Sequence, residues 1–309
     1  MGMEIGFVGL GMMGLPMLEN LARSDSDDRI LAHDRDPARL ARLHAHPAWG
    51  RTLRGAGGLD ELAGCDIVIT MLPDSAVTNA VIEGAPGRPG LMTLLRPGAL
   101  LLDMGSSDPA QTLRLAPLLR AAGLALVDAP VSGAVAKAAA GTLAIMAGGD
   151  AADLERARPL LSRMGATLIP TGAVGSAHAM KALNNYVYAA GLLAASEALL
   201  IARRMDLDLD VFTDVLNASS GRNVATETKL RQFIVPGSYA GGFALALMAK
   251  DLRTADALQA HAGVRAEQLS LCAGLWQRAL AEMEPGVDNT RIHQYLERLN
   301  ASDLAAHLA

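Results

Sequence analysis

Short apolar runs alternate with amphipathic stretches from residue 4 to about residue 170. The runs, which begin with EIGFVGL and end with ATLIPTG, have the length and composition of buried strands. Between them, residues 36–43, 109–122 and 150–164 show helical spacing, and Asp108 followed by Pro109 is a typical helix start. This alternation predicts an α/β fold with a doubly wound, mostly parallel sheet covered by helices on both faces.

The strand pattern stops after Thr171. One long helical pattern runs from about residue 173 to Arg204, and shorter helical patterns separated by Gly, Pro and Asn follow it. A chain of 309 residues is long enough for two domains. We therefore expect a sheet-containing domain over residues 1–170 and an all-α domain over residues 171–309, joined by the long helix.

Charge and cysteine content exclude several classes of protein. There are 27 Lys and Arg against 32 Asp and Glu, a net charge of −5, so no nucleic-acid partner is expected. Cys65 and Cys272 are too few for a disulfide framework and lack the spacing of a zinc site. Both are predicted to be buried thiols, and no metal site is predicted.

The apolar segments carry no targeting or membrane signal. No basic region precedes the first apolar run, so we expect no signal peptide and a cytoplasmic protein. The most apolar helical stretch, residues 189–202, contains Glu197 and falls short of the about 18 apolar residues that a membrane span needs. No association with a membrane is expected.

A glycine motif, GLGMMG, lies between the first strand and the first helix. Glycine is needed first for a tight turn, then for close approach of a pyrophosphate, and last for packing of the helix on the strand. The amino end of the helix adds N–H groups that suit phosphates. The motif predicts a dinucleotide-binding Rossmann domain, and a glycine turn that only packs the helix is the alternative. The loop consists of Gly9, Leu10, Gly11, Met12, Met13 and Gly14.

Asp34 ends the second apolar run, 20 residues after Gly14. A carboxylate at this separation accepts hydrogen bonds from the adenosine ribose and repels the 2′-phosphate of NADP, which favours NAD. Arg35, the next residue, could instead bind that phosphate. NAD is therefore the expected cofactor, with NADP as the alternative.

Further candidate residues follow other strands, at the edge where an open parallel sheet binds ligands. Leu72 and Pro73 follow DIVITM, and Ser106 follows LLLDMG. In DAPVSG, the hydroxyl of Ser132 and the backbone of Gly133 could hold a carboxylate. Ordinary turns are the alternative for Leu72, Pro73 and Ser106.

Lys181 and Asn185 lie four residues apart near the start of the long helix, so they project from one face of it. Apolar surroundings lower the pKa of a lysine and let its amine exchange a proton near neutral pH, which arginine cannot do. Only four of the 27 basic residues are lysines, so a lysine here is informative. A lysine that merely extends into solvent at a helix start is the alternative.

Taken in order, the motifs resemble the β-hydroxyacid dehydrogenase family over nearly the whole chain. They are GFVGLGMMG, DAPVSG with AAAGTL, the pattern of Gly172, Gly175, Lys181, Asn184 and Asn185, and MAKDL. The segments SSGRNVATE and GGFALALMAKDL look most like the 3-hydroxyisobutyrate dehydrogenase branch. In that family, a Rossmann domain precedes an all-helical domain, and the long helix between them carries the catalytic lysine.

The resemblance implies a role for each candidate residue. Lys181 would be the acid/base, Asn185 would orient the substrate, and Ser132 and Gly133 would hold its carboxylate. The cofactor would lie on the glycine loop, with contacts from Leu72, Pro73, Ser106 and Lys250. Two positions depart from the family: Ala134 replaces a second glycine, and Val77 replaces a cofactor-contacting asparagine.

The resemblance also implies a homodimer or homotetramer. Apolar residues such as Leu271, Leu275 and Trp276 would serve that interface or, alternatively, the helical core.

Together these features predict an NAD(P)-dependent oxidoreductase. It would interconvert a small 3-hydroxy acid and its semialdehyde or keto acid by hydride transfer, with a lysine as acid/base. An imine reductase and a non-catalytic nucleotide-sensing protein on the same fold are the alternatives. Both tend to lack the lysine, so Lys181 argues against them.

Overall fold

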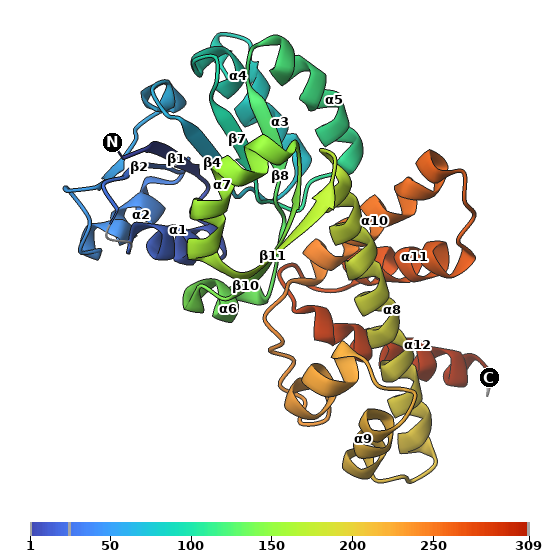
Figure 1. Ribbon diagram of the computed structural model, residues 1–309. Coiled ribbons are helices and arrows are strands. Elements are labelled where there is room, and N and C mark those ends of the chain that lie inside the picture. Colours follow the sequence, from blue (N-terminus) through green and yellow to red (C-terminus); the bar gives the residue numbers. More distant parts are fainter. Residues whose placement is uncertain (1, 24–25, 308–309) are drawn as a thin grey trace. The chain divides into compact units, whose positions relative to one another are not determined.

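The computed structural model describes residues 2–23 and 26–307, with side chains as far as residue 301. The chain divides into two compact units, Met1–Lys181 and Ala182–Ala309. The long helix α8 (Ser176–Arg204) begins in the first unit and continues into the second (Figure 1).

The first unit is built on one large sheet. Its strands are β1 (Glu4–Val8), β2 (Arg29–His33), β3 (Leu53–Gly55), β4 (Ile67–Thr70), β7 (Leu100–Asp103), β8 (Ala125–Asp128), β9 (Val131–Ser132), β10 (Leu143–Gly148) and β11 (Gly165–Gly172). In the order β11-β10-β8-β7-β4-β1-β2-β3, neighbours from β8 to β3 are parallel, as are β10 and β11. β10 is antiparallel to β8 and β9. The expected α/β fold with a mostly parallel sheet is confirmed.

Helices cover both faces of this sheet because both faces are apolar. In β1, Ile5 and Phe7 face one core and Val8 faces the other, and β4 and β7 alternate in the same way. The first core includes residues of α1 (Gly14–Ala22), α6 (Ala134–Ala140) and α7 (Ala151–Met164). The second includes residues of α3 (Ser75–Glu83), α4 (Leu91–Leu94) and α5 (Pro109–Ala121).

Shorter elements complete the first unit. They are α2 (Pro37–Ala41), the 3-10 helices η1 (Arg42–Ala45) and η2 (Leu59–Leu62), and a small hairpin of β5 (Gly84–Ala85) and β6 (Arg88–Pro89). Asp108 caps α5 as expected, since its side chain accepts the N–H of Ala110 and Pro109 is the first helical residue.

The second unit consists of helices around its own core. Besides most of α8, they are α9 (Leu209–Ala218), the π-helical η3 (Thr226–Ile234), α10 (Leu245–Ala262), α11 (Glu267–Glu282), the 3-10 helix η4 (Asn289–Arg291) and α12 (Ile292–His307). Trp276 is fully buried, and Leu275 is half-buried against the core. Of the three apolar residues considered for an interface, only Leu271 is exposed, because α11 turns Trp276 toward the core.

One helix is long and apolar, and both cysteines are buried. By length and composition, α8 could cross a membrane, but core helices of soluble proteins pass the same test, and 44% of its apolar window is buried. Both thiols are buried, as predicted. Burial raises the pKa of Cys65 and of Cys272 to about 12.

Candidate active site

The glycine loop connects β1 to α1 and has the geometry of a phosphate cradle. A Cβ at Gly14 would lie 1.9 Å from the carbonyl oxygen of Gly9, so only glycine lets α1 begin there. Gly9 has a φ of +103°, which glycine adopts without strain. At Gly11 the nearest atom to an added Cβ is Arg39 Nη1 at 3.8 Å, so the backbone lies open to a ligand. The loop therefore fits the pyrophosphate of a dinucleotide at the amino end of a helix.

Asp34 fixes this loop from the end of β2. Its side chain is 4% exposed. Oδ2 accepts the N–H of Leu10 at 2.7 Å, and Oδ1 accepts the N–H of Asp36 at 2.9 Å. Burial raises the pKa of Asp34, but these two N–H groups and the charge of Arg39 outweigh burial and hold the pKa below 3.8. Asp34 is therefore an anion at neutral pH, as the predicted contact with ribose requires.

Arg39 is a residue that sequence reasoning missed. Its guanidinium lies 3.4 Å from Asp34 Oδ2 and 3.6 Å from Asp36 Oδ2. Arg35, which was singled out instead, has an exposed side chain. The feature of the sequence that could have identified Arg39 is Asp36. It caps α2 and so places Arg39 in the first turn of that helix.

The loops that follow β4 and β7 lie side by side. A Cβ at Gly105 would lie 2.9 Å from the carbonyl oxygen of Leu72, and a Cβ at Gly9 would lie 3.1 Å from the side chain of Leu72. Leu72 and Ser106 are half-buried, and Pro73 is exposed. These predicted nicotinamide-side residues therefore lie next to the glycine loop.

The segment DAPVSG follows β8 and continues into β9, where Ser132 pairs with Ala144 of β10. Gly133 has a φ of +140°, and a Cβ there would lie 2.7 Å from the side chain of Lys137. Ala134 has a φ of +55°. This left-handed backbone suits the glycine that the family resemblance leads one to expect here, and alanine adopts it at a cost of about 1–2 kcal/mol.

Lys181 lies in the second turn of α8. Two glycines with positive φ, Gly172 (+121°) and Gly175 (+90°), turn the chain from β11 into this helix. Lys181 is half-buried. Asn185, one turn later, is 5% exposed, and its Nδ2 donates to Asp251 Oδ2 at 2.5 Å.

Asp251 of α10 was not among the predicted site residues, although it contacts two of them. It is 2% exposed, and its Oδ1 lies 3.0 Å from Lys250 Nζ. The two side chains are only 15% and 3% exposed, so this ion pair of adjacent residues is buried and not solvated. The packing of α10 in the second unit buries them both.

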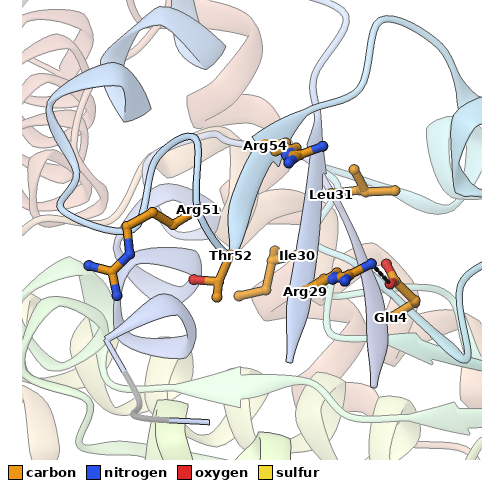
Figure 2. Close-up of a pocket in the computed structure, with 7 residues that line it drawn as sticks. All are labelled: Glu4, Arg29, Ile30, Leu31, Arg51, Thr52 and Arg54. Atoms are coloured by element: carbon orange, nitrogen blue, oxygen red, sulfur yellow. Dashed lines mark hydrogen bonds and ion pairs between the residues drawn. The ribbon is translucent and has the colours of Figure 1, made fainter. Parts of the chain in front are cut away.

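A separate polar pocket of about 260 Å³ lies at the opposite end of the strands (Figure 2). Arg29 and Glu4, an ion pair at 3.3 Å, begin β2 and β1, so the pocket is at the amino ends of the strands. The glycine loop follows the carboxyl end of β1. The pocket is therefore distinct from the candidate cofactor site. It is lined by Glu4, Arg29, Ile30, Leu31, Arg51, Thr52 and Arg54.

Comparison with known proteins identifies the family. Residues 4–175 match the model for the NAD binding domain of 6-phosphogluconate dehydrogenase, and residues 175–296 match that for the NAD-binding region of NADP-dependent 3-hydroxyisobutyrate dehydrogenase.

Relatives of known name cover most of the chain. The 2-(hydroxymethyl)glutarate dehydrogenase of Eubacterium barkeri is 35% identical over 81% of this chain and 80% of its own length. The NAD-dependent L-serine dehydrogenase of Pseudomonas aeruginosa is 34% identical, over 84% and 86% respectively. The structure of Mycobacterium tuberculosis 3-hydroxyisobutyrate dehydrogenase with L-serine is 30% identical, with a TM-score of 0.85, over 96% of this chain and 99% of that one. The chain therefore belongs to the β-hydroxyacid dehydrogenase family and is an NAD(P)-dependent hydroxyacid dehydrogenase.

Proposed function

We propose that the protein reversibly oxidises 3-hydroxy acids of the form HOCH2–CH(X)–COO⁻ to their semialdehydes, with NAD as the preferred cofactor. The names of the relatives support this class. 3-Hydroxyisobutyrate, L-serine and 2-(hydroxymethyl)glutarate each carry a hydroxymethyl group on the carbon that bears a carboxylate. They differ only in X, which is a methyl, an ammonium or a carboxyethyl group.

The carboxylate of such a substrate would bind at Ser132 and Gly133. Ser132 supplies a hydroxyl, and Gly133, with its φ of +140°, presents backbone that no side chain of its own covers. An anchored carboxylate fixes the distance to the reacting carbon. A 3-hydroxy acid then places its carbinol carbon one atom farther from the anchor than a 2-hydroxy acid does, so one arrangement cannot serve both equally.

In the proposed mechanism, Lys181 moves the proton. Its neutral amine takes the proton of the substrate hydroxyl during oxidation, and its ammonium returns it to the carbonyl during reduction. When bound, the dinucleotide supplies the hydride acceptor at its nicotinamide ring. Asn185, held by Asp251, would hydrogen-bond the substrate and keep it oriented.

One observation carries this proposal. Asp128, the last residue of β8, accepts the N–H groups of Gly175 and His178 at 2.7 and 2.9 Å, which lie six and three residues before Lys181. The same Asp128 begins DAPVSG, four residues before Ser132. The carboxylate anchor and the proposed acid/base are therefore attached to the same strand end.

Substitution of Lys181 tests the proposal. Lys181→Ala is expected to lower kcat by about 10²- to 10⁴-fold, the usual contribution of a positioned acid/base, with unchanged NADH binding. The assay follows NADH absorbance with 3-hydroxyisobutyrate, L-serine and 3-hydroxypropionate, and with lactate as a 2-hydroxy control. A variant that retains wild-type turnover would refute the role of Lys181, and faster oxidation of lactate would refute the substrate class.

We further propose that the protein self-associates as a homodimer or homotetramer. Large apolar side chains of the second unit that are more than half exposed support this, namely Val187, Ile201, Met205, Val211, Val215, Val224, Val264 and Leu271. Light scattering of the purified protein measures its mass, and a monomer at micromolar concentration would contradict this proposal.

A further inference from the structure

A cluster of buried polar side chains lies at the carboxyl ends of β7 and β8, beneath the start of α8. Asp103 is 4% exposed, Asp128 0% and His178 1%. Burial of carboxylates and of an imidazole is unfavourable unless hydrogen bonds compensate for the lost water. The hydrogen-bond partners of these three side chains show which segments of the chain the cluster connects.

Asp128 holds the first turn of α8 from outside that helix. Its two oxygens accept the N–H groups of Gly175 and His178 at 2.7 and 2.9 Å. Negative charge is favourable at the amino end of a helix. Gly148 of β10 makes room for this contact, because a Cβ there would lie 2.7 Å from both Asp128 Oδ1 and Ser176 Oγ.

The imidazole of His178 continues the cluster toward α5. Its Nδ1 lies 2.8 Å from Thr112 Oγ1, and that hydroxyl donates to the carbonyl oxygen of Asp108 at 3.2 Å. A Thr112 hydroxyl that donates to Asp108 accepts from Nδ1, which corresponds to the tautomer with the ring proton on Nδ1. The ring also faces both carboxylates: Nε2 is 3.7 Å from Asp103 Oδ2, and Nδ1 is 3.9 Å from Asp128 Oδ2.

Asp103 connects the cluster to the loop that follows β7. It accepts hydrogen bonds from Ser107 Oγ at 2.6 Å, Thr70 Oγ1 at 3.1 Å and the N–H of Gly105 at 3.2 Å. Ser106, the predicted nicotinamide-side residue, lies between Gly105 and Ser107. The ring of His178 is thus packed between the carboxylate that fixes the Ser106 loop and the carboxylate that begins DAPVSG.

We infer that His178 is a positioning residue that fixes Lys181 relative to the loops of Ser106 and Ser132. His178 and Lys181 are three residues apart on α8, one turn along the same face. Its ring is buried and makes no contact with solvent, so it acts through the placement of the helix and not on the substrate. This inference rests on the proposed role of Lys181 as acid/base.

A double-mutant cycle tests the inference. His178→Ala in the otherwise unchanged protein is expected to lower kcat about 10- to 100-fold, the loss that follows a small misplacement of a catalytic group, with unchanged KM for NAD. In a Lys181→Ala background, His178→Ala is expected to lower the residual kcat no further, because the group that it positions is absent.

Matched variants separate positioning from general loss of packing. His178→Asn retains a donor at the place of Nδ1 and is expected to restore part of kcat. His293→Ala is the control, because it also removes a fully buried histidine, in the second unit, and is expected to lower the unfolding temperature without lowering kcat. If His178→Ala does not fold, Thr112→Val keeps the ring of His178 and removes its Nδ1 partner, together with the hydroxyl's own hydrogen bond to Asp108, and is expected to lower kcat in the same direction.

The outcomes distinguish the two proposals. Equal losses of kcat from His178→Ala in both backgrounds, or a wild-type kcat for a folded His178→Ala, overturn the positioning role of His178. Neither result affects the proposed role of Lys181 as acid/base. Wild-type turnover by Lys181→Ala alone overturns the proposed mechanism, and the inference with it.

Discussion

Replacement of Asp34 by serine tests how the chain selects its cofactor. The carboxylate accepts the N–H groups of Leu10 and Asp36, and the side chain is 4% exposed, so it is both rigid and anionic. A hydrogen bond to a charged group contributes about 1.5–3 kcal/mol. Loss of one such bond to the adenosine ribose corresponds to a fall in NAD affinity of roughly 10- to 150-fold.

The same change should improve the binding of NADP. Without the carboxylate of Asp34, the 2′-phosphate loses one source of repulsion. Arg39, which lies 3.4 Å from that carboxylate in the native protein, also becomes available to the phosphate. The ratio of kcat/KM for NAD to kcat/KM for NADP is therefore expected to fall by at least the roughly 10- to 150-fold that is lost in NAD affinity. The N–H of Leu10 also loses its acceptor, so a decrease of about 1–3 kcal/mol in the free energy of unfolding is expected.

The assay compares initial rates with both cofactors at saturating 3-hydroxy acid. Arg39→Gln is the control, because it keeps the carboxylate, and it is expected to retain the preference for NAD. An NAD to NADP ratio that is the same in Asp34→Ser and the native protein would refute the assignment of Asp34 to the ribose.

Two further predictions concern the cofactor loop and the pH dependence of stability. Gly14→Ala places a Cβ 1.9 Å from the carbonyl oxygen of Gly9, so calorimetry should show a lower unfolding temperature and fluorescence titration should show no NADH binding. Asp28→Asn should lower the free energy of unfolding at pH 7 by about 3 kcal/mol, since Asp28 is 7% exposed and pairs with Arg163 at 2.7 Å. Burial raises the pKa of Asp28, but hydrogen bonds from Met3, Arg163 and Ser26 hold it below 3.8.

The sign of the pH effect follows from this lowered pKa. The stability that Asp28 contributes is present above pH 3.8 and is lost as the pH falls through the lower pKa of the folded state. The free energies of unfolding of the native protein and Asp28→Asn, measured by urea titration, should therefore differ most above about pH 5 and converge in acid. A difference that is constant with pH would contradict the argument.

Gly64→Ala, where an added Cβ meets no atom within 4 Å, is a control for Gly14→Ala and should bind NADH normally.

Local patterns in the sequence predicted the parts of the site that depend on local geometry. GLGMMG fixes a turn within six residues, Asp34 directly follows the adjacent strand, and the spacing of Lys181 and Asn185 follows from helical periodicity. Each of these positions could be placed without knowledge of strand order.

Residues brought together by strand order or helix packing could not be found in this way. Asp103 and Asp128 become neighbours only because β7 pairs with β8, and His178 joins them only because α8 begins beside those strand ends. Asp251 contacts Asn185 from a helix 66 residues away in sequence. A single sequence carries no record of these pairings, so no role was predicted for these buried acids.

The two buried thiols make this chain convenient for selective chemical labelling. With a pKa of about 12, each native cysteine is a thiolate only about once in 10⁴ to 10⁵ molecules at pH 7.5, whereas an exposed cysteine is ionised roughly once in ten. A maleimide would therefore modify a cysteine introduced in place of Met12, which is 75% exposed in the glycine loop, and spare both natural ones. The speed of that modification, with and without dinucleotide, would report occupancy of the loop directly and without any turnover.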